Sequence, residues 1–90
     1  MTVAELSKVL YELDVPSDLY RLDGSHRELA TVLARRGSKW VVFLSERGEE
    51  SDPVEFDNED HACVYFLGSV CLDLVGRGQL RAAQADPRTD

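Results

Sequence analysis

Few side chains in this sequence have the identity and spacing that catalysis requires. The two histidines, His26 and His61, are the obvious candidates for a general base. Neither lies in a Gly-x-Ser-x-Gly turn or in another setting that activates a nucleophile. His26 follows a Gly-Ser turn and is expected in an exposed loop, and His61 is expected in the first turns of a helix. We therefore expect a protein that is not an enzyme.

The cysteines and acids do not form a recognisable metal site. Cys63 and Cys71 are eight residues apart in one predicted helix, so about 12 Å of helix axis separates them and they cannot form a disulfide with each other. The sequence has no Cys-x-x-Cys pair, and the acidic run lacks the spaced oxygens and central glycine of a calcium loop. We expect both cysteines to be reduced and buried, and we expect no metal and no cofactor.

The location of the net negative charge is the most distinctive feature of the chain, because it lies in residues 46–60. This segment holds eight of the seventeen acids and one of the ten bases, so it accounts for the whole net charge of −7. Concentrated charge can steer a basic partner into contact, although a solvated loop followed by an acidic helix start would have the same composition. The acids expected to contact a partner are Glu46, Glu49, Glu50, Asp52, Glu55, Asp57, Glu59 and Asp60.

A single base interrupts the acidic run. Arg47 lies between acids in Ser45-Glu46-Arg47-Gly48, at the end of a predicted strand. Its guanidinium could pair with Glu46, Glu49 or Asp57 and order the segment. We expect that structural role for Arg47.

Helical and strand patterns alternate along the chain. Thr2 and Glu5 form a capping box, and apolar residues then recur at three- and four-residue steps up to Leu13, so the first helix should end near Asp14, ahead of Pro16. A turn region is expected at 48–53. Strand character is found in 19–22, 28–35, 40–45 and, as a short edge strand, 54–56.

A second helix is predicted to follow Asp57, which would cap it. Its apolar residues, from Ala62 to Val75, cover most of the circumference. Such a helix must be covered on more than one side, either by the sheet and the first helix or by a second copy of the protein. Trp40 begins the clearest strand and is expected in the core.

These elements predict one α+β domain over residues 1–80 with a flexible tail over 81–90. The expected architecture is two-layered, with an antiparallel sheet of three or four strands and both helices on one face, in the order α-β-β-β-(β)-α. Charged residues interrupt the N-terminal apolar positions, so we expect no signal peptide, no membrane span and a cytoplasmic location. An isoelectric point near 4.7 argues against binding nucleic acid.

Residues 28–66 carry a family resemblance. The string Trp40-Val41-Val42-Phe43-Leu44-Ser45-Glu46-Arg47-Gly48, followed by the spaced residues Phe56, Glu59, Ala62, Cys63, Tyr65 and Phe66, resembles small cytoplasmic immunity proteins of bacterial polymorphic-toxin systems. In those chains a glutamate such as Glu28 lies on the preceding strand. The resemblance implies that the protein binds and blocks a cognate secreted toxin, whose basic active site for nucleic acid would meet the acidic surface.

Two other functions stay open. A homodimeric regulatory or adaptor protein would use the additional apolar face of the second helix. A small-molecule enzyme or ligand-binding domain would use a pocket between sheet and helices. The protein is thus expected to be a monomer or a homodimer.

Overall fold

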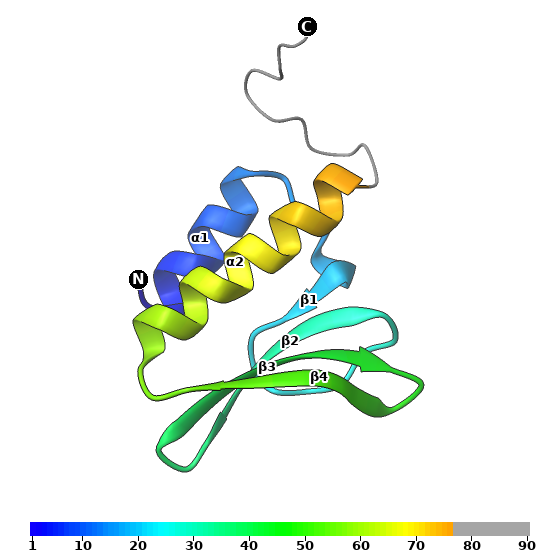
Figure 1. The fold of residues 1–90 in the computed structure, drawn as a ribbon. Coiled ribbons are helices and arrows are strands. Elements are labelled where there is room, and N and C mark those ends of the chain that lie inside the picture. Colours follow the sequence, from blue (N-terminus) through cyan, green and yellow to red (C-terminus); the bar gives the residue numbers. More distant parts are fainter. Residues whose placement is uncertain (77–90) are drawn as a thin grey trace, which may run out of the picture.

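The computed structural model describes residues 1–76 and contains two layers, with both helices on one side of a four-stranded sheet (Figure 1). The predicted α+β class is confirmed, whereas the predicted boundary at residue 80 and the tail 81–90 lie outside the described residues. The elements in chain order are α1 (Val3–Glu12), the short 3-10 helix η1 (Ser17–Leu19), β1 (Tyr20–Arg21), β2 (Ala30–Arg36), β3 (Lys39–Glu46), β4 (Glu49–Phe56) and α2 (Glu59–Gly76).

Helix α1 begins as its sequence predicts. The Glu5 N–H donates to the Thr2 hydroxyl at 3.1 Å, and the Thr2 N–H donates to the Glu5 carboxylate at 2.8 Å, which completes the capping box. The chain leaves the helix through Asp14, whose φ of 57° is left-handed. Pro16, which cannot continue a helix, directly precedes η1 as its N-cap residue.

The sheet has the order β1-β2-β3-β4, and it is mixed rather than wholly antiparallel. β2, β3 and β4 pair antiparallel, but β1 pairs parallel to β2, with Tyr20 opposite Thr31. The expectation of an antiparallel first strand was therefore wrong. Asp23 and Gly24 do not make a hairpin turn into β2, because residues 22–29 instead return along the sheet before β2 begins.

Strand β4 is longer than its sequence suggests. Val42 lies opposite Val54 while Leu44 lies opposite Ser51, so β4 holds one extra residue between these pairs. Asp52 lies at this bulge with a φ of 52°. The predicted turn region at 48–53 is thus mostly strand, because an edge strand tolerates a bulge and the missing N–H of Pro53.

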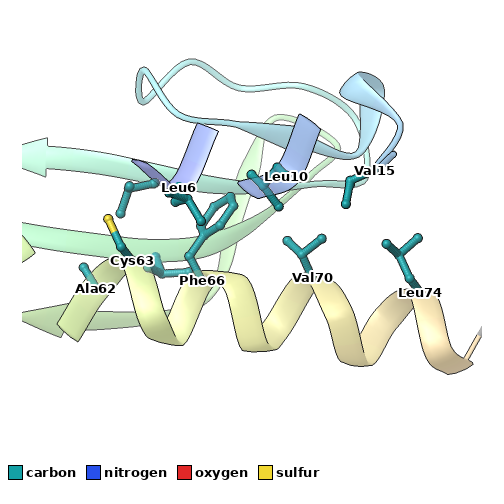
Figure 2. Close-up of a cluster of buried hydrophobic side chains, with 10 residues drawn as sticks. Leu6, Leu10, Val15, Ala62, Cys63, Phe66, Val70 and Leu74 are labelled. Carbon is teal, nitrogen blue, oxygen red and sulfur yellow. The ribbon is translucent and has the colours of Figure 1, made fainter. Parts of the chain in front are cut away.

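The main core lies between the sheet and the helices. Leu33 and Val42 point from the strands toward α1 and α2, since alternate strand residues face the same side. Figure 2 shows Phe66 of α2 pointing toward Leu6 and Leu10 of α1, and all three are fully buried. At its edge the core includes the half-buried side chain of Trp40, so this predicted core aromatic packs there without full burial.

A loop covers the opposite face of the sheet. Val32, Ala34, Val41 and Phe43 form a second buried cluster on that face. Residues 22–29, which connect β1 to β2, pass over it: the His26 ring packs on Phe43 at 5.3 Å between centroids. A Cβ added to Gly24 would lie 3.3 Å from that of Ala34, so only glycine lets the loop approach this closely.

Candidate functional site

The eight acids expected to contact a partner do not form one cluster. They extend along the edge strand β4 and past both its ends, from Glu46 at the close of β3 to Asp60 in the first turn of α2. At ~3.3 Å per residue, a strand of this length separates its ends by roughly 20 Å. The fold therefore divides the acids into groups with different surroundings.

Three acids at the α2 end of β4 are bound to other parts of the same chain. Asp57 pairs with Lys39, and Asp60 pairs with the amino group of Met1. The hydrogen bonds from these cations hold the pKa of both carboxyls below their usual range. The Glu59 carboxylate accepts from the Val3 N–H at 2.8 Å, where it also complements the positive end of α1.

Glu50 is bound on the loop-covered face of the sheet. Arg36 donates to it with both terminal nitrogens, one of them at 3.1 Å, and lowers the pKa of its carboxyl. His26 lies 3.7 Å from the same carboxylate. The guanidinium of Arg36 also lies over the Phe43 ring at 5.2 Å, so this ion pair closes the edge of the second buried cluster.

The other four acids, Glu46, Glu49, Asp52 and Glu55, have no hydrogen bond or ion pair to the described part of the chain and are exposed. Glu55 still lies in the field of two bases, since it contributes to raising the pKa of Arg36 and of Lys39. Glu46 and Glu49 flank the turn between β3 and β4, and Asp52 lies at the bulge of β4. We call these three the hairpin acids.

The turn between Glu46 and Glu49 is strained. Glu46 and Glu49 are direct cross-strand partners, and like charges in that position repel. The turn between them consists of Arg47 and Gly48, both with positive φ, at 55° and 78°. Such a two-residue turn favours asparagine and glycine, and a left-handed arginine costs on the order of 1 kcal/mol. Unfavourable charge and backbone geometry thus coincide at an exposed position, as they often do at functional sites.

The expected role of Arg47 was wrong. Its guanidinium makes no ion pair with Glu46, Glu49 or Asp57 within residues 1–76. Asp57 is bound by Lys39 instead. What holds the turn is the backbone N–H of Arg47, which donates to the Glu28 carboxylate at 3.0 Å.

The predicted N-cap residue of α2 was also wrong by one position. Asn58, not Asp57, precedes α2 and accepts from the His61 N–H at 2.8 Å through its side-chain oxygen. His61 is exposed in the first turn, and its ring contacts the Asn58 side chain. His26 is partly covered by its packing on Phe43.

A groove of about 300 Å³ lies beside the hairpin acids, between α2 and the sheet. Its exposed apolar lining is Leu29, Leu44 and Tyr65, and Asp52 stands at its rim. We call this the hairpin groove. The ligand-binding alternative assumed a pocket between sheet and helices, but the residues that line it were not predicted. Helix α2 carries a signal for them, because Tyr65, Ser69 and Asp73 recur at four-residue steps and so share one partly polar side of the helix.

Within residues 1–76, no group of three or more His, Cys, Asp or Glu side chains is placed to hold a metal ion. No helix in the same range combines the length and apolar character needed to cross a membrane.

Comparison with protein-family models, with curated proteins and with solved structures finds no match to this chain.

Proposed function

We propose that the protein is a protein-binding inhibitor, an immunity protein whose hairpin acids meet a basic surface on a cognate toxin. One observation carries the proposal: of the eight acids, Glu46, Glu49 and Asp52 have no hydrogen bond or ion pair within the described residues, and the first two face each other across an exposed, strained turn. Their mutual repulsion costs stability in the free protein and would be relieved by a basic partner. The resemblance of residues 28–66 to immunity proteins agrees with this function.

The chemistry of the partner follows from that of the site. An enzyme that acts on nucleic acid carries positive potential around its active site, because it must attract phosphates. Carboxylates at a protruding turn compete for that potential and speed diffusional encounter. The protein would then inhibit by occupying the cleft, with no catalytic step of its own.

The test measures association with the candidate toxin encoded by the neighbouring gene. Glu46→Gln combined with Glu49→Gln removes two charges from the turn, and Glu12→Gln combined with Asp14→Asn removes two exposed charges from the end of α1. At low salt, stopped-flow association should slow several-fold for the first variant and change little for the second. The difference should shrink as salt screens charges beyond ~8 Å at physiological ionic strength. Equal association rates for both variants, or undiminished toxin activity at stoichiometric protein, would contradict the proposal.

A second candidate function is favoured by the outer side of α2. Val64, Leu72 and Val75 are 55%, 75% and 44% exposed, and Gly68 lies between them with open space around it. The sheet and α1 cover only the buried stripe of this helix, so no described residue packs over these three side chains. A homodimeric adaptor would bury them against a second copy. Sedimentation of wild type and of Leu72→Glu decides: a dimer lost in the variant supports the adaptor, and a wild-type monomer at high concentration excludes it.

A further inference from the structure

The hairpin groove exists because α2 leaves one end of the sheet uncovered. Val42 and Leu44 are alternate residues of β3 on the helix-facing side, yet Val42 is 3% exposed and Leu44 is 37% exposed. Val42 belongs to the main core, whereas Leu44 lies opposite Ser51, next to the bulge of β4. The helix side chains that line the groove include Ser69, whose side chain is short. A leucine is thus left at the floor of an open groove.

The wall of the groove is aromatic and held in place. Tyr65 on α2 is 43% exposed, and its ring rests against Phe56 with 5.2 Å between centroids. The contact fixes the orientation of the tyrosine while part of the ring stays accessible. Leu29, 53% exposed, adds apolar surface at the end of the 22–29 loop, next to the start of β2. A side chain that occupies the groove would therefore contact Leu44 on its floor and the ring of Tyr65 on its wall.

The charge of the groove has one sign. Asp52 and Asp73 are the charged side chains in the described lining, and Asp52 is exposed and has no partner within residues 1–76. The volume is at the lower end of the ~300–1,000 Å³ typical of ligand sites, so it suits one or two side chains rather than a large cofactor. The complementary occupant has an apolar stem and a cationic end.

Arginine meets these requirements better than lysine. Its methylene stem can lie along Leu29 and Leu44 while the head group stays near the rim. Its planar guanidinium stacks on aromatic rings and forms paired hydrogen bonds with a carboxylate, which a lysine ammonium does not. Tyr65 and Asp52 provide one partner of each kind.

We propose that the hairpin groove receives an arginine side chain of the partner protein, with Asp52 binding the guanidinium and Tyr65 stacking on it. The inference deepens the proposed function, since it rests on a basic protein partner meeting the hairpin end. It assigns the two parts of the surface different roles. Glu46 and Glu49 accelerate encounter, and the groove retains the partner once it is bound.

The test uses a small probe, so it does not depend on the identity of the toxin. Isotope-labelled protein is titrated with N-acetyl-arginine amide and, separately, with the citrulline amide, which has nearly the same shape and no charge. The arginine probe should give saturable shifts at the amides of Leu44, Ser51, Asp52, Tyr65 and Ser69. The citrulline probe should give none that saturate in the same range.

Variants separate the groove from the general acidity of the hairpin. Asp52→Asn keeps the left-handed backbone, which asparagine tolerates, and should weaken the arginine probe roughly two- to fivefold, as the loss of an exposed ion pair does. Tyr65→Leu keeps apolar surface and should weaken it comparably. Glu49→Gln removes one charge outside the groove and should have little effect. Thermal melting checks that each variant is folded.

Shifts spread evenly over all exposed acids, equal affinity for the citrulline probe, or an equal loss in Asp52→Asn and Glu49→Gln would overturn the inference. These outcomes are distinct from failure of the proposed function. Arginine can occupy the groove even if no toxin binds, and a toxin can depend on Glu46 and Glu49 while Asp52 and Tyr65 are dispensable.

Discussion

The carboxylate of Glu28 binds the backbone N–H of Arg47, nineteen residues along the chain, at 3.0 Å. This bond joins the end of the loop over the outer sheet face to the turn between β3 and β4. Because an arginine with positive φ does not favour that turn by itself, the acceptor on Glu28 helps to hold it. The loop, the turn and the hairpin acids are therefore one connected structure.

Replacing Glu28 should loosen the turn specifically. Glu28→Ala removes the acceptor and should lower the unfolding free energy by about 0.5–1.5 kcal/mol, the usual net value of such a bond. Hydrogen exchange of the Arg47 amide should accelerate. Glu28→Gln retains an acceptor oxygen and serves as the control, with exchange close to wild type. If the hydrogen-exchange rate of the Arg47 amide is unchanged in Glu28→Ala, the turn is stable without this hydrogen bond.

Acid should destabilise the protein partly through Glu50. The hydrogen bonds from Arg36 hold the pKa of Glu50 below its ordinary value of 4.5. A group whose pKa is lower when folded contributes stability above its unfolded pKa and loses that contribution as pH falls through the folded pKa. Urea unfolding of wild type should therefore give a free energy that declines from about pH 5 to pH 3.

The contribution of Glu50 appears as a difference between variants, because Asp57 and Asp60 also titrate with lowered pKa. Glu50→Gln should be less stable than wild type at neutral pH and should decline less on acidification. Glu49→Gln, which removes an unpaired charge opposite Glu46, should be as stable as wild type or slightly more so at neutral pH. If both variants follow the wild-type curve, the Arg36 pair contributes nothing in solution.

The two cysteines should differ in reactivity. Cys63 is fully buried and Cys71 is partly exposed, so the expectation that both are buried holds only for Cys63. Burial, with a smaller effect of nearby Glu59, raises the pKa of the Cys63 thiol and reduces the reactive thiolate.

Iodoacetamide labelling followed by mass spectrometry should show Cys71 modified first in the native protein. Cys63 should react at a comparable rate only in denaturant. In Cys71→Ser the fast phase should disappear. Equal native rates, or a mass two units lower from an internal disulfide, would be incompatible with α2 as described, because a continuous helix keeps these sulfurs apart.

Short-range rules were sufficient for most of the secondary structure. The capping box at Thr2 and Glu5 and the aromatic and β-branched run from Trp40 each act within a few residues, and both predicted elements are present. The two-layer arrangement also follows, because amphipathic elements must bury their apolar sides together. The parallel β1 could not be predicted, since a strand of two residues has almost no pattern of its own.

The site was predictable in composition and not in arrangement. The concentration of acidic residues between 46 and 60 is visible in the sequence, and the hairpin acids are three of these eight residues. Which acids stay uncompensated depends on partners far along the chain: Arg36 binds Glu50 across 14 residues and Lys39 binds Asp57 across 18. Those pairs require the strand register to be known.

The local sequence thus determined most helices and strands and the negative charge of the surface formed by residues 46–60. Secondary-structure propensity, helix capping and local charge all depend on residues close together in the chain. Tertiary structure alone decided that Glu46, Glu49 and Asp52 have no partner within residues 1–76 and that Leu44 and Tyr65 face an open groove. The long-range ion pairs decide the first result, and the bulge in β4 contributes to the second. A bulge shifts which side chains meet on the neighbouring strand, and no pattern within β4 itself specifies where that shift falls.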